Sequence, residues 1–129
     1  MNEIEVLINS LKSDDEEARR TAIEMLGELK AVEALPHLID LISKENWRLR
    51  KTIIEAFKKI DDITCLPTIT NIVKSPNVEI HSTAIDALVY FGERSVPFVL
   101  PLLKEKDHDI RILSANILGF IKSRASVNE

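Results

Sequence analysis

The side chains that most often bind metals or act as nucleophiles are few in this chain and far apart. The histidines are His37, His81 and His108, and Cys65 is the single cysteine. Metal sites need several ligands at short spacings, and a cysteine nucleophile needs a base near it. No such spacing occurs, nor does a Gly-rich phosphate loop or a Ser/His/Asp arrangement. The sequence therefore predicts no catalytic residue, metal site or cofactor, and a reduced, structural Cys65.

A pattern of two residue types recurs along the whole chain. Asx residues stand 31, 31 and 30 positions apart, at Asp15, Asn46, Asn77 and Asp107. Four residues after each stands Arg19, Arg50, His81 or Arg111. Self-similarity at a fixed period of roughly 20 to 50 residues indicates stacked supersecondary units. We interpret the Asx residues as N-caps, because their short side chains accept hydrogen bonds from the first turn of a helix.

Each unit is predicted to be a pair of helices. Apolar residues spaced i, i+1, i+4, as in Leu7, Ile8 and Leu11, give the first helix an apolar face, and Pro36, Pro67 and Pro97 fall near the start of three first helices. The predicted helices span residues 2–12, 15–29, 33–43, 46–60, 64–74, 77–91, 95–104 and 107–122. One domain over residues 1–129 would hold units of about 1–30, 31–61, 62–92 and 93–122, with a tail at 123–129.

The second helices are predicted to carry apolar core positions and to end in a left-handed residue. In the first unit the predicted core positions are Ala18, Ala22, Met25, Leu26 and Leu29. The predicted helix ends are Gly27, Gly92 and Gly119, with Asp61 and Asp62 in the unit that lacks a glycine.

Charge and hydropathy limit the classes of partner. The net charge is −4, and residues 1–64 hold 14 acidic and 10 basic side chains, whereas residues 65–129 hold 7 of each. Nucleic-acid binding depends on clustered Lys and Arg, so we expect no nucleic-acid partner. No apolar run reaches the roughly 20 residues of a membrane-spanning helix, and the first residues lack a secretory signal pattern. We expect a cytoplasmic protein.

The runs Asp14–Gly27 (DDEEARRTAIEMLG) and Leu35–Ile42 (LPHLIDLI) resemble HEAT repeats of the phycobiliprotein-lyase type. The resemblance implies an all-α, right-handed α-solenoid of four helix pairs, with the second helices lining a concave surface. It also implies that the arginine column braces neighbouring turns, and His81 departs from that pattern, so we expect a weaker brace there.

The concave surface carries the candidate binding residues. Glu24, Glu55 and Asp86 fall in one column and would form an acidic ladder for a basic protein or peptide. Alternatively, Arg20 and Lys51, four residues before Glu24 and Glu55, neutralise them locally. The remaining candidates on this surface are Trp47, Thr52 and Tyr90.

Apolar residues replace charged ones toward the C-terminus of the same surface, at Ile112, Leu113 and Phe120. A terminal repeat usually presents a polar outer face. These three residues therefore indicate either a homodimer or partner contact or ordinary packing of the last helix.

The sequence thus favours a noncatalytic protein-binding adaptor. The alternative is an auxiliary or regulatory subunit of an enzyme such as a chromophore lyase. A small metalloenzyme is disfavoured, because HEAT-like deoxyhypusine hydroxylases bind iron through His-Glu dipeptides, and the three histidines here precede Leu38, Ser82 and Asp109.

Overall fold

Helices form all the regular structure in the computed structural model, which describes residues 2–128 and the side chains of residues 2–125. The α-helices are α1 (Glu3–Ser10), α2 (Glu16–Glu28), α3 (Leu35–Ile42), α4 (Trp47–Ile60), α5 (Leu66–Val73), α6 (His81–Phe91), α7 (Val96–Val99) and α8 (His108–Asn128). Short 3₁₀ turns are η1 (Val32–Ala34), η2 (Ile63–Cys65), η3 (Val78–Ile80), η4 (Gly92–Ser95) and η5 (Leu100–Lys104). No strand occurs within residues 2–128, and the predicted all-α fold class is confirmed.

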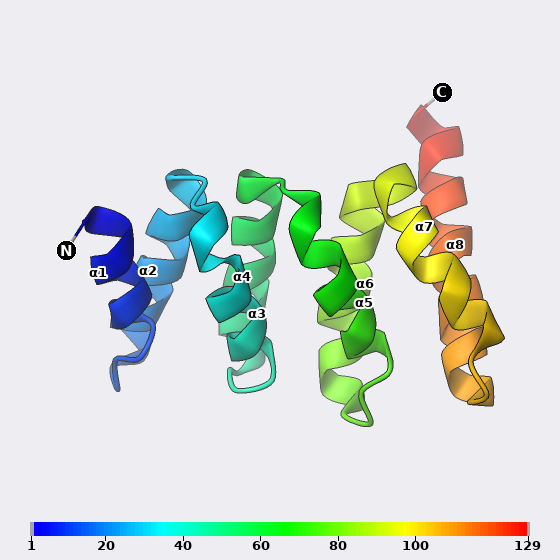
Figure 1. Cartoon of the computed structure of the whole chain (residues 1–129), viewed down its shortest axis with the longest axis horizontal. Helices are drawn as coiled ribbons and strands as arrows, with labels where there is room; N and C mark the ends of the chain where they lie inside the picture. The colour runs from blue at the N-terminus through cyan, green and yellow to red at the C-terminus, as the bar shows by residue number, and fades with distance from the viewer. Residues whose placement is uncertain (1, 129) are drawn as a thin grey trace. The chain divides into compact units, whose positions relative to one another are not determined.

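The chain divides into two compact units, Met1–Asp62 and Ile63–Glu129. The division falls where the second predicted repeat ends and the third begins. Within the first unit, α1 and α3 form one layer and α2 and α4 form the other (Figure 1). Within the second unit, α5 and α7 lie against α6 and α8. A single domain of four repeats stays a prediction.

The Asx residues cap helical turns as the sequence predicts. The backbone N–H of Glu17 donates to the Asp15 side chain at 3.3 Å, and that of Leu49 donates to Asn46 at 3.1 Å. Asn77 caps the turn η3 that leads into α6, and Asp107 accepts from the N–H of Asp109 at 2.8 Å. These bonds satisfy N–H groups that have no partner inside the helix.

Prolines explain one difference from the predicted helices. Pro36 and Pro67 lie in the first turns of α3 and α5, where proline is favoured. The fourth first helix, predicted as continuous over 95–104, stops at Val99 and continues as the 3₁₀ turn η5. Pro101 is the reason, because it lacks an N–H group and its ring crowds the preceding turn.

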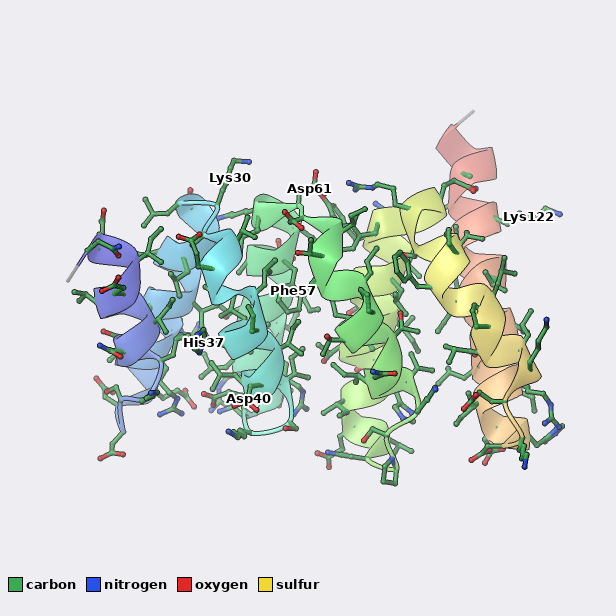
Figure 2. All side chains as sticks on the ribbon, in the orientation of Figure 1. Lys30, His37, Asp40, Phe57, Asp61 and Lys122 are labelled. Carbon is green, nitrogen blue, oxygen red and sulfur yellow. The ribbon has the colours of Figure 1, made fainter. Side chains whose placement is uncertain are left out.

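The core of the first unit lies between its two helix layers. Ile23 and Leu26 of α2 and Ile53 and Phe57 of α4 are at most 1% exposed, and Figure 2 shows Phe57 in the body of the unit. Full burial of a side chain of this size stabilises a fold by about 1.5–3 kcal/mol. Leu38 of α3 is also fully buried, so both helix layers supply the core.

Two predicted core positions are wrong. Met25 is 39% exposed and Leu29 is 42% exposed. Their equivalents in the second repeat, Ala56 and Ile60, are buried. The difference has a physical reason: α4 packs on the α2 of the preceding repeat, whereas α2 has no earlier second helix among the described residues.

Two of the three predicted glycine helix ends are also wrong. Gly27 and Gly119 lie inside α2 and α8, and only Gly92 has a positive φ, of 60°. The left-handed residues that follow α2 and α4 are Lys30 (φ 52°) and Asp61 (φ 50°), labelled in Figure 2. The Asp61 prediction is confirmed. Since Gly119 does not stop α8, the helix continues to Asn128, past its predicted end at 122, and Glu129 lies outside the described residues.

Candidate functional site

A groove between the second helices of the first unit contains several predicted site residues. Its volume is about 300 Å³, and we call it the second-helix groove. The groove is lined by Glu24, Lys51, Thr52, Glu55, Ala56 and Lys59. The structure thus brings together Glu24 and Glu55, two members of the predicted ladder, from α2 and α4. Asp86, the third, is exposed on α6 in the second unit.

The ion pairs on this face differ from the predicted ones. Arg20 pairs with Glu17 at 3.4 Å rather than with Glu24, and Glu55 pairs with Lys58 at 3.3 Å rather than with Lys51. Both observed pairs are spaced i, i+3, which helix geometry permits as readily as i, i+4. Glu24 has no ion pair with any residue in the described part of the chain, so it remains available on the groove wall.

Lys59 and Glu28 join the two helices at one end of the groove by an ion pair. The Lys59 ammonium, which donates a hydrogen bond to it, lowers the pKa of the Glu28 carboxyl. In turn, donating this hydrogen bond to Glu28 raises the pKa of Lys59, and the charges of Glu28, Glu24 and Glu55 add to this effect. The groove therefore stabilises a positive charge.

The other candidates on the first unit lie on α4. Trp47, the first residue of the helix, is 58% exposed, and the Arg48 guanidinium lies 5.8 Å from its ring centroid. Thr52 is half-buried, and its hydroxyl donates to the Arg48 carbonyl at 3.2 Å. Trp47 therefore offers a large apolar surface, whereas the Thr52 hydroxyl is already engaged.

The candidates on the second unit form a separate set. Tyr90 is half-buried, packs edge to face on Phe91 with ring centroids 5.2 Å apart, and lines a cavity of about 270 Å³. On α8, Ile112 is 48% exposed and Phe120 is 54% exposed, whereas Leu113 is half-buried. Packing within the unit therefore covers part of the Leu113 side chain and leaves about half of Ile112 and Phe120 exposed.

The arginine column acts within each repeat by closing the loop that precedes its own second helix. The guanidinium groups of Arg19, Arg50 and Arg111 donate to the carbonyls of Ser13 and Asp14, of Glu45, and of Glu105 and Lys106. His81 keeps the same contact, since its Nε2 lies 2.6 Å from the Ser75 carbonyl oxygen. A carbonyl oxygen only accepts, so Nε2 carries the proton. The sequence predicts a weaker brace at His81, but the structure shows that His81 keeps the loop contact of its column.

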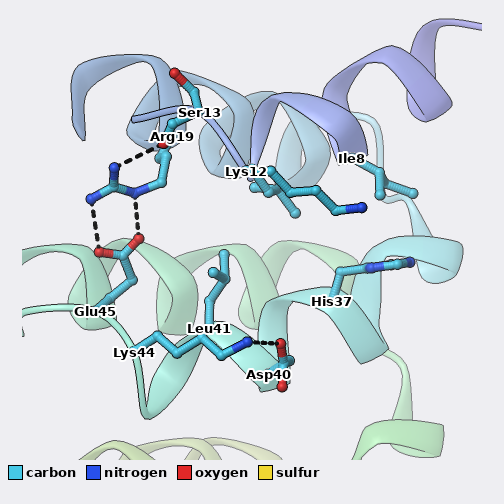
Figure 3. Close-up of a pocket in the computed structure, with 10 residues that line it drawn as sticks. Ile8, Lys12, Ser13, Arg19, His37, Asp40, Leu41, Lys44 and Glu45 are labelled. Carbon is cyan, nitrogen blue, oxygen red and sulfur yellow. Dashed lines mark hydrogen bonds and ion pairs between the residues drawn. The ribbon is translucent and has the colours of Figure 1, made fainter. Parts of the chain in front are cut away.

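Arg19 makes a second contact that joins two repeats. Its Nε and Nη2 bind the two carboxylate oxygens of Glu45 at 2.6 and 3.1 Å, as the paired dashed lines in Figure 3 show. Donating these hydrogen bonds to the Glu45 carboxylate raises the pKa of Arg19. Glu45 was not among the predicted residues, although its place directly before the cap Asn46 matches that of Asp14 before Asp15.

Asn46 and Glu16 form a further link between the same repeats. The Asn46 amide donates to the Glu16 carboxylate at 2.5 Å, and Arg48 lies 3.5 Å from it. The Asn46 hydrogen bond, followed by the charge of Arg48, lowers the pKa of Glu16. A predicted cap therefore also connects α4 to α2.

A second cavity of the first unit, about 350 Å³ in volume, lies between α1 and α3 (Figure 3). Lys12 and His37 line it, and its Lys44 and Asp40 side chains pair with each other at 2.6 Å. Within residues 2–125, no group of three His, Cys, Asp or Glu side chains is placed to hold a metal ion. Cys65 is buried. No helix of the described chain is long and apolar enough to cross a membrane.

Comparisons with known proteins identify the repeat. A family model described as HEAT repeats matches residues 4–72, more than half of the chain. A search of curated proteins finds no match. Among solved structures, the chain is similar to an engineered protein determined by the Northeast Structural Genomics Consortium, with 16% identity and a TM-score of 0.48. That similarity covers 93% of this chain and 64% of the engineered protein, so the chain spans less than two thirds of its length. On the extent of the family match, the chain belongs to the HEAT-repeat family.

Proposed function

We propose that this chain is a noncatalytic scaffold that binds a protein or peptide on the second-helix face of its first unit. The second-helix groove carries the proposal, because it is an open recess of about 300 Å³ on a rigid helix pair and holds two carboxylates. The occupant fitted to it is a peptide segment or protein loop that places a basic side chain against Glu24 and Glu55.

Charge on the groove walls supports a basic group in the partner. Glu24 has no ion pair with a described residue, and together with Glu55 it already favours the ammonium of Lys59. A basic side chain from a partner would meet the same two carboxylates. Lys51 lies on the α4 wall and has no ion pair in the described chain, so it is available to an acidic side chain of the partner. Charge complementarity of this kind selects partners and fixes their register.

Trp47 supports the same face as a contact surface. Trp residues dominate binding energy at protein interfaces because they bury a large, rigid apolar area. Here the side chain is 58% exposed at the start of α4, the helix that forms one groove wall. We therefore propose Trp47 as the apolar anchor and the groove carboxylates as the polar contacts.

Two finer expectations belong to the proposal and rest on the sequence. One is membership of the phycobiliprotein-lyase type, whose support is the resemblance of Asp14–Gly27 and Leu35–Ile42. The other is a cytoplasmic location, whose support is the use of a single, buried cysteine.

Affinity capture from the source cell tests the proposal. A variant with Glu24→Lys and Glu55→Lys is expected to lose captured partners by at least about tenfold, since each reversal replaces an attraction by a repulsion. Glu33→Lys, a charge reversal at an exposed position outside the groove, is the control and is expected to retain them. An unchanged partner set for the double variant would refute the groove as the binding site. Adding Asp86→Lys to the double variant then tests whether the second unit contributes to partner binding.

Trp47→Ser tests the apolar anchor separately. We expect it to weaken the same partners, whereas Val78→Ser, which truncates a side chain that is 73% exposed in the second unit, should leave them unchanged. Equal effects of the two changes would show that surface hydrophobicity in general, not Trp47, holds the partner. Circular dichroism confirms that each variant is folded.

A further inference from the structure

The contact between α2 and α4 shows how the second helix of one repeat packs on that of the preceding repeat. The Arg19 fork binds Glu45 of the following repeat, and a methyl group added to Gly27 would lie 3.0 Å from Ala56 Cα. Gly27 thus allows a close approach of the two helices. We call this combination of an arginine fork and a glycine on the receiving helix the receiving face.

Helix α8 carries the same receiving face. Arg111 and Gly119 follow the cap Asp107 at the same intervals at which Arg19 and Gly27 follow Asp15. Arg111 Nη1 donates to the loop carbonyls of Glu105 and Lys106, both at 2.8 Å, as Arg19 does to its own loop. Its Nε has no carboxylate partner in the described chain, and its Nη2 lies 3.4 Å from His108 Nδ1. On the edge that binds Glu45 in the first repeat, the last repeat therefore has an Nε without a carboxylate and an Nη2 with only a long contact to His108.

The surface around Gly119 is also uncovered. A methyl group added to Gly119 would meet nothing within 4 Å. Ile112 and Phe120, both about half exposed, stand where α2 carries Arg20 and Glu28. The receiving face of α8 is therefore more apolar than that of α2. Burying it against another helix would remove more apolar surface from water.

The opposite end of the chain carries the residues that such a face accepts. Asp14 occupies the position of Glu45, directly before an Asx cap. Met25 and Leu29 occupy the positions of Ala56 and Ile60, which are buried in α4, yet they are 39% and 42% exposed. We call these positions, which pack on a receiving face, the incoming face; that of the first repeat is not covered by a second helix among the described residues.

Side-chain sizes on the two faces are complementary. In the α2–α4 contact the small incoming residue Ala56 lies against Gly27, and one turn before Gly27 α2 carries the large, buried Ile23. On α8 the residue equivalent to Ile23 is the smaller Ala115, exposed beside Gly119, and on α2 the incoming residue is the larger Met25. Close packing requires such matching of volumes.

We propose that copies of this chain associate head to tail, with α2 of one copy packing on α8 of the next as α4 packs on α2. In this contact the Asp14 carboxylate binds the Nε and Nη2 edge of Arg111, Met25 lies over Gly119, and Leu29 covers Phe120. A contact between two different faces is heterologous, so each copy has one of each. The proposal is independent of the second-helix groove.

Light scattering across a wide concentration range, on the full chain, tests this with two variants. Gly119→Arg blocks the receiving face at a position with free space, and Met25→Arg blocks the incoming face at an exposed position. Ser82→Arg, which introduces an arginine at an exposed position of α6, is the control. The wild type and Ser82→Arg are expected to reach at least twice the monomer mass of 14.6 kDa, whereas each blocked variant stays monomeric.

Mixing the two blocked variants distinguishes the possible geometries. Head-to-tail contact predicts that an equimolar mixture doubles in mass and grows no further, because it pairs the intact receiving face of Met25→Arg with the intact incoming face of Gly119→Arg. A wild type that is monomeric at the highest concentration overturns the proposal. So does a dimer that Gly119→Arg abolishes but Met25→Arg leaves intact, since that result indicates a symmetric α8 contact.

Discussion

Arg19 of α2 and Glu45, in the loop before α4 of the next repeat, form a two-pronged ion pair with nitrogen–oxygen distances of 2.6 and 3.1 Å. The Glu45 side chain is 5% exposed, and that of Arg19 is 20% exposed. Arg50 donates to the backbone carbonyl of the same Glu45 at 2.7 Å. Glu45 thus connects the arginines of two repeats, while the third repeat has Pro76 in its place and cannot supply a carboxylate.

Replacing Glu45 is expected to destabilise the first unit. Glu45→Ala removes two charge-assisted hydrogen bonds and leaves the largely buried edge of Arg19 without an acceptor, so the free energy of unfolding should fall by about 2 kcal/mol. Urea denaturation followed by circular dichroism measures this. Glu33→Ala, at an exposed position without an ion pair in the described chain, should change it by less than about 0.5 kcal/mol. Equal stabilities of the two variants would contradict the role given to Glu45.

His81 is expected to behave as a functional equivalent of the arginine in its column. His81→Leu removes the donor to the Ser75 carbonyl and should lower the free energy of unfolding by about 1 kcal/mol. His81→Arg should preserve stability, because Arg19, Arg50 and Arg111 reach the equivalent carbonyls. Thermal denaturation of the two variants compares them. If the Leu variant melts with the wild type, the contact does not contribute.

The repeated local features could be predicted from the sequence, because a cap or a first-turn proline acts through its own backbone neighbours. Asp15 and Asn46 are examples. The errors arise where the environment of a residue depends on another repeat. Met25 occupies a core position in the sequence pattern. It is exposed because no second helix precedes α2 among the described residues.

The candidate site was predicted only in part for the same reason. Glu24 and Glu55 share a repeat column, and that periodicity places them on one face. The ion-pair partners of charged side chains do not follow the repeat. Lys59 of α4 pairs with Glu28 of α2, whereas Arg20 pairs with Glu17 of its own helix. Such choices depend on rotamers and on the approach of α2 and α4, which the sequence pattern does not specify.

Gly27 and Gly119 occupy equivalent repeat positions and are expected to respond oppositely to alanine. Gly27→Ala places a methyl group 3.0 Å from a backbone atom of Ala56, which cannot rotate away, so the free energy of unfolding should fall by about 1–2 kcal/mol. Gly119→Ala meets open space and should raise it by about 0.5–1 kcal/mol, since alanine favours a helix. Urea denaturation of dilute protein measures both. Equal effects would show that helix propensity alone governs these positions.

Stability is expected to depend on pH through the Glu28–Lys59 pair. Because the folded-state pKa of Glu28 lies below its ordinary value of 4.5, its contribution is present above that value and is lost as the pH falls through the lowered pKa. The pKa of Lys59 is raised above 10.5, so its contribution is present below that value and is lost as the pH rises through the raised pKa.

Melting temperatures of the wild type and Glu28→Gln, measured from acid to alkaline pH, check both windows. The substitution removes the charge of Glu28, so the difference between the two proteins should be largest near neutral pH and shrink toward either extreme. Glu16, whose pKa is also lowered, should keep part of the acid dependence in the variant. Glu33→Gln is the matched control and should follow the wild type. A constant difference across the range would mean that Glu28 acts through packing and not through its charge.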